Sequence, residues 1–427
     1  MAYWLEHSKE AELKTSDVII VGAGSVGVPT ALALAERGFK TRVIDMHPSP
    51  GQGENKHAIG GIRATHSDPA KILTCRRSLE IFSTWQDLHG DDIEWLKGGY
   101  VFPVYRKKDE TVLKKLLPVQ KKYGLQIDFV KPEDIQQLIP GINPQGLRGG
   151  TFSPDDGSIS PLLAVNAFYQ RAVELGVDFH FKERVGQIQV ENNRIIGVET
   201  GNSEYRAPIV VDTAGPFSPE LSRTAGIDLK VVPDSHEGAI TEPVRPFFKC
   251  MVVDIRPGPG SKNFYFYQNL HGQVIFCITP DPPIVGTDKG ETAEFLPQVS
   301  ARLVHLLPRL KNLRVRRTWR GLYPMTPDGS PLADDQTFTY RVLDEHSSVD
   351  PQIVEDVSGS EIVRDLFEGL YNQDADGNLV PGVALSHTLS DDGLTYTFTL
   401  ADGVNFHDGT SMTAEDVVFS LDRARAE

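Results

Sequence analysis

The sequence predicts an α/β protein whose first part is a Rossmann-like dinucleotide-binding unit. Residues 17–45 have the pattern of a short apolar strand, a glycine-rich turn, a helix and a second strand. The turn carries Gly-x-Gly-x-x-Gly, and an aspartate closes the second strand 18 residues after the last of these glycines. Together the strand, the turn and the acid predict a dinucleotide site, although a glycine-rich turn in an unrelated α/β protein has the same pattern.

Each glycine of the turn has its own physical task. Gly22 permits the tight turn, Gly24 lets the backbone approach a pyrophosphate, and Gly27 lets the helix pack closely on the strand. The helix N-terminus suits the pyrophosphate, and the carboxylate of Asp45 suits a pair of ribose hydroxyls. The pattern alone leaves both NAD and FAD open as the dinucleotide.

Composition limits the class of protein. The 427 residues suffice for two or three domains, and no apolar run approaches the ~18 residues that a membrane span needs. The charged N-terminus lacks the apolar segment of a secretory signal, so a cytoplasmic location is expected. Three cysteines far apart in the sequence fit a reducing compartment and predict neither a disulfide framework nor a metal site.

The net charge of −15 is unevenly distributed. Residues 333–427 contain 20 acidic residues, four arginines and no lysine, whereas residues 1–332 are close to neutral. So abrupt a change predicts two segments of different origin.

Periodicity predicts further elements. Helices are expected over residues 26–37, 70–89 and 162–175, and strands of a meander over 177–200 with Asn192-Asn193 as a turn. Residues 209–215 form a second buried strand that ends in Ala-Gly, where a glycine lets the chain pass close to a cofactor.

Two basic stretches raise the question of nucleic-acid binding. Lysine pairs recur seven residues apart over 107–122, which places them on one helix face, and arginines cluster over 314–320. Because the surrounding segment is neutral overall, solvated faces are expected instead, and no nucleic-acid partner is predicted.

The long loop over residues 47–68 is too long for a simple connection, which suggests a function. Its Gly60, Gly61, Ile62 and Arg63 would bring backbone amides and a guanidinium to a bound cofactor, and a solvated loop is the alternative.

Several motifs in order along the chain resemble the D-amino-acid oxidase superfamily of FAD-dependent oxidoreductases. They are the glycine turn, GGIR at 60–63, DDGSISP at 155–161, DTAGPFSPELSRTAGI at 212–227, TEP at 241–243 and WRGLYPMTPDGSPL at 319–332. The resemblance covers residues 15–332 and is greatest to sarcosine oxidase β subunits, glycine oxidases and D-amino-acid dehydrogenases. It implies a Rossmann-like FAD-binding domain interleaved with a substrate domain built on a large antiparallel sheet, to which residues 264–277 would contribute strands above the flavin.

The resemblance also implies the site residues. FAD would be held by Gly22, Gly24, Ser25, Val26, Gly27, Asp45, Met46, Gly60, Gly61, Ile62, Arg63, Val185, Ala214 and Gly215. The substrate face would carry His236, Tyr265, Tyr267 and His271, each of which also fits a structural role. Because some related enzymes attach flavin through a histidine in this loop, His57 is a candidate attachment point, with an ordinary polar histidine as the alternative.

Such an enzyme removes hydride from the carbon next to an amine nitrogen, so no catalytic triad and no metal are expected. The implied substrate is a small amine or amino acid of the sarcosine, glycine, proline or D-amino-acid type, with oxygen or a carrier accepting the electrons. A hetero-oligomer, as in sarcosine oxidases, is a possible assembly.

Two departures from the family pattern stand out. Tyr323 occupies the position where related oxidases often carry an arginine that binds the substrate carboxylate. The family motifs also stop near Leu332, before the segment that normally closes the flavin site, which would weaken flavin binding.

The remaining segment resembles peptide-binding proteins of ABC transporters, family 5. LVPGVA, SDDGLTYTFTLADGVNFHDG and TAEDVVFSL carry this resemblance. Residues 394–400 alternate as a strand, Asp402-Gly403 marks a turn, and Thr413 caps a helix with Asp416 three residues later. The segment is expected to be weakly stable and to contribute nothing to flavin binding.

These observations predict three parts, joined between Leu332 and Thr337. They are an extension (1–16), an oxidoreductase (17–332; FAD-binding over 17–90 and 150–230, substrate-binding over 91–149 and 231–320) and a partial solute-binding segment (333–427). Alternative interpretations are a solute-binding or interaction protein defined by its last segment, and a catalytically impaired chimera.

Overall fold

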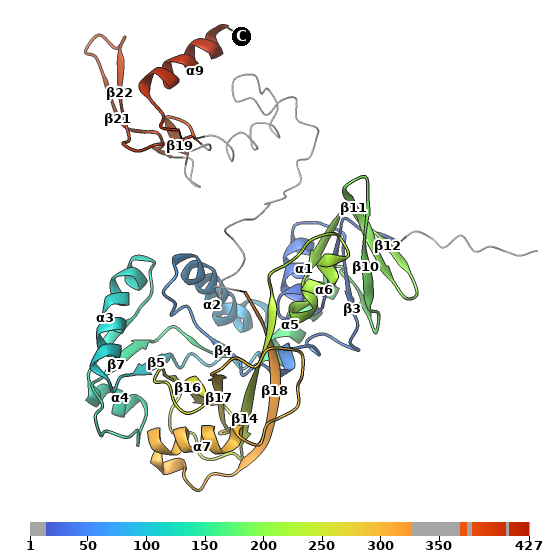
Figure 1. Cartoon of the computed structure of the whole chain (residues 1–427), viewed down its shortest axis with the longest axis vertical. Coiled ribbons are helices and arrows are strands. Elements are labelled where there is room, and N and C mark those ends of the chain that lie inside the picture. The colour runs from blue at the N-terminus through green and yellow to red at the C-terminus, as the bar shows by residue number, and fades with distance from the viewer. Residues whose placement is uncertain (1–13, 327–367, 374–377, 407–409, 427) are drawn as a thin grey trace, which may run out of the picture. The chain divides into compact units, whose positions relative to one another are not determined.

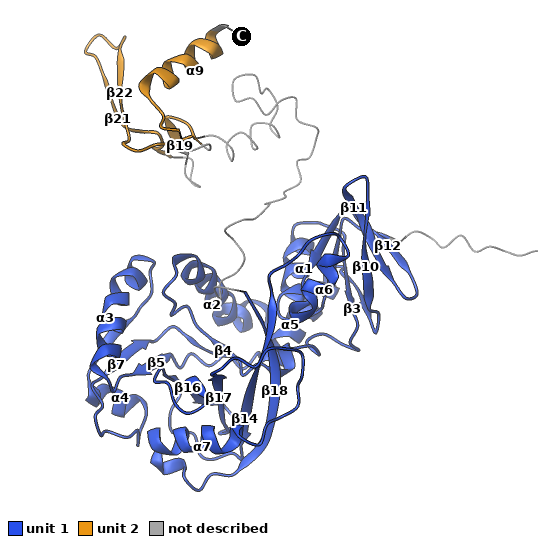
Figure 2. Ribbon diagram, in the orientation of Figure 1, with its two compact units in different colours: residues 1–332 blue, residues 333–427 orange. Residues whose placement is uncertain are grey.

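The computed structural model describes residues 14–326, 368–373, 378–406 and 410–426. Figure 2 shows the two compact units into which the chain divides, residues 1–332 and 333–427. The join expected between Leu332 and Thr337 lies outside the described residues.

One half of the first unit contains a four-stranded parallel sheet, with helices beside it (Figure 1). Its strands, in spatial order, are β13 (Ile209–Asp212), β2 (Val18–Val21), β3 (Thr41–Asp45) and β9 (Asp178–Phe181). Two helices cross over between parallel strands, α1 (Gly27–Glu36) after β2 and α5 (Pro161–Glu174) before β9. This is the mixed α/β arrangement that the sequence predicts.

Both faces of this sheet are buried, which explains the unbroken apolar run of β2. Val18 and Ile20 pack toward α1 and α5. Ile19 and Val21 pack on the opposite side, against a small antiparallel sheet and α6 (Ser218–Arg223).

The small sheet consists of β10 (Val185–Glu191), β11 (Arg194–Thr200) and β12 (Glu204–Arg206), with β1 (Lys14–Thr15) parallel at its edge. Asn192 and Asn193 turn the chain with φ of 49° and 60°, the positive values of a type I′ hairpin turn, as predicted. The expected meander over 177–200 is wrong at its first strand. Because β9 follows α5, it pairs in parallel with β3 and belongs to the other sheet.

The second half of this unit is an eight-stranded sheet. Its order is β18 (Val315–Met325), β14 (Val232–Thr241), β17 (Val274–Pro280), β16 (Ser261–Gln268), β15 (Met251–Asp254), β5 (Tyr100–Pro103), β7 (Gly150–Ser153) and β6 (Asp128–Val130). The sheet is antiparallel throughout except between β15 and β5, where its two separate stretches of sequence meet. The predicted strands over 264–277 are confirmed as parts of β16 and β17.

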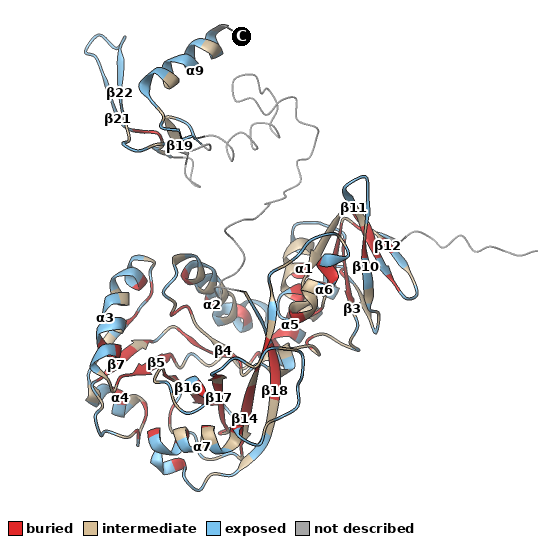
Figure 3. Cartoon of the chain, in the orientation of Figure 1, coloured by how far each residue is buried: buried red, intermediate tan, exposed pale blue. Residues whose placement is uncertain are grey.

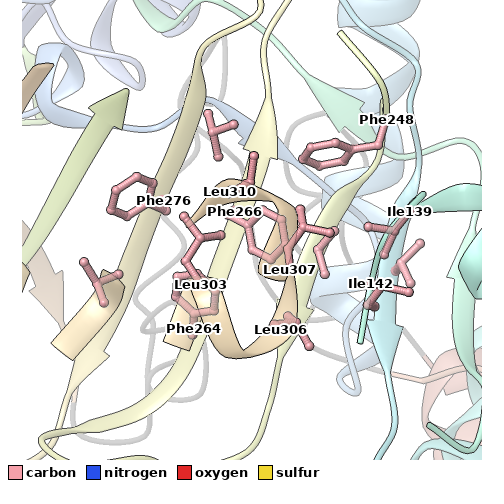
Figure 4. Packing of buried hydrophobic residues seen from close by; sticks show 14 of the residues in the cluster. Ile139, Ile142, Phe248, Phe264, Phe266, Phe276, Leu303, Leu306, Leu307 and Leu310 are labelled. Carbon is pink, nitrogen blue, oxygen red and sulfur yellow. The ribbon is translucent and has the colours of Figure 1, made fainter. Parts of the chain in front are cut away.

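Helices cover one face of this large sheet. Figure 4 shows Phe264, Phe266 and Phe276 of the strands packed with Leu303 and Leu306 of α7 (Phe295–Leu306). Isoleucines from and just after α4 (Pro132–Leu138) complete this core. Strand residues alternate between faces, so the neighbouring residues of the same strands point to the opposite face, which looks toward the parallel-sheet half.

Two longer helices remain in the described part of this unit: α2 (Pro69–His89), whose Trp85 packs on Phe168 of α5, and α3 (Lys107–Lys122). The expected helix over 70–89 is α2, which begins where the Asp68 carboxylate accepts a hydrogen bond from the Lys71 amide at 2.9 Å. The lysine pairs lie on α3, where Lys107, Lys114 and Lys121 are exposed and form ion pairs with acidic neighbours. Short elements complete the unit: η1 (Asn55–His57), β4 (Gly61–Ile62), β8 (Gly157–Ser158), η2 (Gly215–Phe217) and η3 (Pro308–Leu310).

In its described residues, the second unit forms two hairpins and a helix. They are β19 (Tyr371–Gln373) with β20 (Leu379–Pro381), β21 (Ala384–Leu389) with β22 (Tyr396–Leu400), and α9 (Ala414–Ala426). The predicted strand is confirmed as β22, and the Asp416 carboxylate accepts hydrogen bonds from the Thr413 amide and hydroxyl at the start of α9. Figure 3 colours most of the described residues of this unit as exposed. Tyr396 and Phe419 are among its exposed apolar residues.

Within the described ranges, no helix is both long and apolar enough to cross a membrane.

The core on the helix-covered face supports a stability prediction. Phe266 is fully buried, so Phe266→Ala removes a whole ring from close packing and should lower the free energy of unfolding by about 3–5 kcal/mol. Urea unfolding followed by tryptophan fluorescence measures this, because all four tryptophans precede Leu332. As a control, Phe419→Ala in the second unit alters an exposed ring and should leave that transition unchanged.

Candidate functional site

The glycine turn after β2 is compact enough that two of its positions admit only glycine. Gly22 has φ of 111°, and a Cβ there would lie 2.5 Å from the carbonyl oxygen of Thr213. A Cβ on Gly27 would lie 1.9 Å from the carbonyl oxygen of Gly22. Because of these close approaches, the N-terminus of α1 packs directly on the ends of β2 and β13. The first backbone amides of α1 therefore lie at one edge of the parallel sheet.

Gly24 differs from its neighbours, because a Cβ built there would meet nothing within 4 Å. The turn therefore needs no glycine at this position for its own packing. A cavity runs alongside, and of the predicted cofactor residues Gly22, Gly24, Asp45, Met46, Val185, Ala214 and Gly215 line it. Open space beside a helix N-terminus is what an approaching pyrophosphate requires.

Asp45, at the end of β3, connects the glycine turn to the start of the following loop. One carboxylate oxygen accepts a hydrogen bond from the Ala23 amide at 2.6 Å, and the other accepts one from the His47 amide at 2.7 Å. The acid therefore fixes the turn as well as lining the cavity. Ser25, Val26 and Gly27 lie on the helix side of the turn and do not line the cavity.

Sequence reasoning missed several residues of this cavity. Thr213 donates its hydroxyl hydrogen bond to the Val21 and Gly22 carbonyls at 2.9 Å, and Glu183 and Arg184 line the wall beside Val185. The DTAG motif contained the signal for Thr213, because a residue directly after a strand that pairs with β2 must adjoin the glycine turn.

Gly60 to Arg63 lie in a different place, on the segment that faces the large sheet. Gly61 and Ile62 form β4 and pair with β8. A Cβ on Gly61 would lie 2.1 Å from the Tyr100 hydroxyl, so the segment packs closely on the large sheet. Arg63 donates to the carbonyl oxygen of Thr65.

A buried carboxylate holds this segment from behind. Asp156, which is 1% exposed, accepts hydrogen bonds from the Ala64 amide at 2.9 Å and from the Thr65 hydroxyl. Burial raises the pKa of Asp156 above its ordinary value, and the hydrogen bonds from Thr65, Ala64 and Ser153 oppose that rise.

The predicted substrate residues His236, Tyr265 and Tyr267 share one face of the large sheet. The register pairs His236 with Gly321, Tyr265 with Cys277 and Tyr267 with Ile275, and alternation then directs all three away from the helix-covered face. The Tyr267 hydroxyl donates to the Ile59 carbonyl at 2.6 Å, which joins this face to the 54–63 segment. His271 lies elsewhere, in the exposed turn after β16, with Nε2 2.7 Å from a carboxylate oxygen of Glu94.

Tyr323, at the position of the absent arginine, belongs to a neutral cluster on this face. Its ring stacks on His236 with centroids 4.2 Å apart, and its hydroxyl is hydrogen-bonded to Tyr265. Burial lowers the pKa of His236, with Asp234 opposing this, and its Nδ1 is buried with no partner among the described residues. A polar atom of a bound molecule would satisfy that nitrogen.

His57 is fixed against β18. Its carbonyl oxygen accepts a hydrogen bond from Trp319 Nε1 at 2.7 Å, and its Nδ1 is 3.5 Å from a carboxylate oxygen of Glu54. Burial lowers the pKa of His57. In the part of the chain that the structure describes, no three His, Cys, Asp or Glu side chains are grouped to hold a metal ion.

Comparison with known proteins decides the family. Residues 17–349 match the model of the FAD dependent oxidoreductase family. The chain belongs to this family. FAD is therefore its cofactor, and the cavity beside Gly24 has the open glycine edge and helix N-terminus that suit the pyrophosphate of FAD.

Curated relatives resemble the same part of the chain. A protein named FAD-dependent oxidoreductase domain-containing protein 1, from Xenopus laevis, is 24% identical over 72% of this chain and 70% of its own length. Mitochondrial sarcosine dehydrogenase of Mus musculus is 24% identical over 74% of this chain, which spans only 36% of that enzyme. Sarcosine oxidase subunit beta of Rhodobacter capsulatus is 24% identical over 75% of this chain and 77% of its length.

Solved structures agree on the fold. L-proline dehydrogenase from P. horikoshii superposes with a TM-score of 0.70 and 29% identity, covering 75% of this chain and 84% of that one. Glycine oxidase from Geobacillus kaustophilus gives a TM-score of 0.66 at 20% identity, covering 74% and 85%.

The last segment matches a second family. Residues 378–427 match bacterial extracellular solute-binding proteins, family 5. The periplasmic murein peptide-binding protein MppA of Escherichia coli K12 is 42% identical over 97 residues, which are 23% of this chain and 18% of MppA. The two sequence resemblances are thus both confirmed.

The open space beside Gly24 allows FAD binding to be tested by substitution. Gly24→Val should fit the unliganded turn but fill the space that the pyrophosphate needs, so the protein should bind FAD at least tenfold more weakly while unfolding at an unchanged temperature. Flavin titration and thermal unfolding of the FAD-free protein measure the two effects. Gly201→Val is the matched control, since a Cβ there also meets nothing within 4 Å and Gly201 does not line the cavity. Undiminished flavin affinity of Gly24→Val would contradict the prediction.

His66, which follows Arg63 in the same segment, is expected to make the stability of the protein depend on pH. Burial, with the positive charge of Arg63, lowers the pKa of His66 to about 4, so the folded protein keeps this side chain neutral in a range where the unfolded chain protonates it. Above the ordinary histidine pKa of about 6.5, His66 therefore does not lower the free energy of unfolding. As the pH falls from there toward 4, the free energy of unfolding decreases, because the unfolded chain takes up a proton that the folded protein does not. Urea unfolding at a series of pH values should show a shallower decline for His66→Gln than for the natural protein, and equal slopes would refute this origin.

Proposed function

We propose that the chain is an FAD-dependent oxidoreductase that oxidises a small amine or amino acid at the carbon next to nitrogen. The observation that carries the proposal is the pairing of two features within one unit, an FAD-suited cavity and a sheet face of ordered, neutral aromatic side chains. When bound, FAD supplies a hydride acceptor. The side chains of this unit bind and orient the substrate and exclude water from it.

The proposed cofactor contacts fall into two groups. Gly22, Gly24, Ser25, Val26 and Gly27 offer the backbone of the glycine turn. Further contacts come from the strand ends and from the segment against the large sheet: Asp45, Met46, Val185, Ala214, Gly215, Gly60, Gly61, Ile62 and Arg63.

His236, Tyr265 and Tyr267 are proposed to line the substrate side. Their support is the shared sheet face and the unsatisfied Nδ1 of His236. His271 is proposed only as a residue that positions Glu94, because its ring lies in an exposed turn. For His57, an ordinary polar histidine beside the Glu54 carboxylate is preferred over a point of flavin attachment.

Sarcosine, glycine, proline and D-amino acids are the proposed substrates, with oxygen or a carrier as electron acceptor. The names of the relatives support sarcosine, L-proline and glycine. One relative is named as a subunit, which supports a hetero-oligomer for this chain as well. A cytoplasmic location stays part of the proposal. The alternative of a solute-binding protein is not favoured, because the matching segment spans only 18% of MppA.

We also propose that the two family segments are separate domains with a boundary between Leu332 and Thr337. The division of the chain into units at residue 332 and the change of net charge at the same point support it.

The proposal predicts a flavin spectrum and its loss on reduction. Purified protein should absorb near about 370 and 450 nm, because FAD brings its own chromophore. Anaerobic addition of sarcosine, glycine, L-proline or a D-amino acid should bleach the band near about 450 nm. Bleaching by none of these compounds would refute the proposed activity, and colourless protein that does not take up FAD would refute the cofactor assignment for this chain.

A further inference from the structure

A second cavity lies on the same sheet face as the proposed substrate residues, beside the 54–63 segment. It measures about 240 Å³, somewhat below the range of about 300–1,000 Å³ for pockets that hold drug-sized ligands. Its walls come from the segment before β4, from β8, and from strands β14, β16, β17 and β18. A ligand of this cavity must therefore be a small molecule.

The floor of the cavity is apolar and fixed. Tyr267 is 4% exposed and Ile275 is 9% exposed. The Tyr267 hydroxyl is already bonded to the Ile59 carbonyl, and the Trp319 ring is held through its bond to the His57 carbonyl. These rings are consequently available to a ligand as rigid apolar surfaces rather than as hydrogen-bond donors.

One part of the lining is positively charged. Lys56 and Arg317 both line the cavity, both are exposed, and neither has an ion-pair partner among the described residues. Burial is the main cause of the lowered pKa of His57, and the charges of Lys56 and Arg317 add to that lowering. Their fields therefore converge on the same part of the loop, where an anionic group would be stabilised.

Another part of the lining is acidic. Among the described residues, Glu94 is the carboxylate that lines this cavity. Its backbone has φ of 56°, in the left-handed region that a glutamate rarely adopts, and its amide donates to a carboxylate oxygen of Asp92 at 2.8 Å. His271 Nε2 lies 2.7 Å from Glu94 Oε1, so the side chain is held in place from outside the cavity. Backbone strain of this kind is retained where the position of a side chain matters.

We propose that this cavity binds a small zwitterion with one carboxylate and one ammonium group, an amino acid. The carboxylate lies toward Lys56 and Arg317, and the ammonium lies toward Glu94, which His271 positions. The identification of the ligand as an amino acid rests on the proposed function, whereas the opposite charges of the lining do not.

This site is separate from the neutral cluster at Tyr323. Arg317 precedes Tyr323 by six residues on β18, which corresponds to about 20 Å along an extended strand. The cluster of Tyr323, His236 and Tyr265 offers no cation to a carboxylate. The charged cavity is thus a place to capture an amino acid on the sheet face, apart from the residues proposed to orient it for oxidation.

Three ligands that lack an oxidisable C–H next to nitrogen test the site without turnover. 2-Aminoisobutyrate has both charges, isobutyrate has only the carboxylate, and tert-butylamine has only the ammonium. Calorimetric titration of the full-length FAD-bound protein should show that 2-aminoisobutyrate binds more tightly than either singly charged ligand, because only the zwitterion meets both charged parts of the lining.

Substitutions then assign the two ends. Arg317→Ala should weaken binding of 2-aminoisobutyrate and isobutyrate about fivefold and leave tert-butylamine unchanged, in line with an exposed charge pair. Glu94→Gln should weaken 2-aminoisobutyrate and tert-butylamine but not isobutyrate. Arg317→Lys should restore most of the carboxylate affinity. Arg316→Ala is the matched control, because Arg316 is equally exposed on the same strand but does not line the cavity.

The outcomes separate this proposal from the proposed function. Binding of 2-aminoisobutyrate that is equal in Arg317→Ala, Glu94→Gln and the Arg316→Ala control overturns the site, whatever the flavin does. Weakened binding in the first two variants alone supports it. Failure of every amine to bleach the flavin overturns the oxidase function but leaves this binding result standing as evidence for an amino-acid site.

Discussion

The segment from Gly51 to His66 is the structural constraint on which the first unit depends. It begins at the glycine turn, where the Gly51 amide donates to the Ala23 carbonyl at 2.8 Å. It then crosses to the large sheet, where Trp319 and Tyr267 donate to the carbonyls of His57 and Ile59. A buried backbone carbonyl that lost its partner would cost about 1–3 kcal/mol, so these bonds fix the path of the segment between the two halves. The FAD cavity and the aromatic sheet face are thereby connected within the first unit.

The same segment is held from its other side by Asp156. A carboxylate that is 1% exposed is stable only when its oxygens are satisfied, and here the Ala64 amide and the Thr65 hydroxyl are among its donors. Those partners lie directly after Arg63. The motif DDGSISP is thus explained by physical chemistry within this chain. Its second aspartate positions the GGIR segment, and its Gly157-Ser158 pairs with that segment as β8.

Local features of the fold could be predicted from sequence because neighbouring residues determine them. An apolar run buried on both faces, an Asn-Asn hairpin turn and the Thr413–Asp416 pair at a helix start each depend on residues close together in the chain. Contacts between elements that are distant in the sequence could not be predicted in this way. Nothing within 177–200 shows that β9 pairs with β3, and nothing near Glu94 indicates that His271, 177 residues later, lies beside it. The charged cavity escaped prediction for this reason.

The sheet face that carries Tyr323 has neutral residues at one end of β18 and charged residues at the other. Tyr323 carries no charge, and in this chain its ring stacks on His236 while its hydroxyl is hydrogen-bonded to Tyr265. Lys56 and Arg317, which have no ion-pair partner among the described residues, line the cavity near the start of β18 rather than beside His236. Because alternate residues of one strand share a face, Arg317, Trp319, Gly321 and Tyr323 form a graded line from charged to neutral surface. In the proposed function, the charged end of this line would hold a zwitterionic amino acid, and the neutral end would surround the amine in its uncharged form.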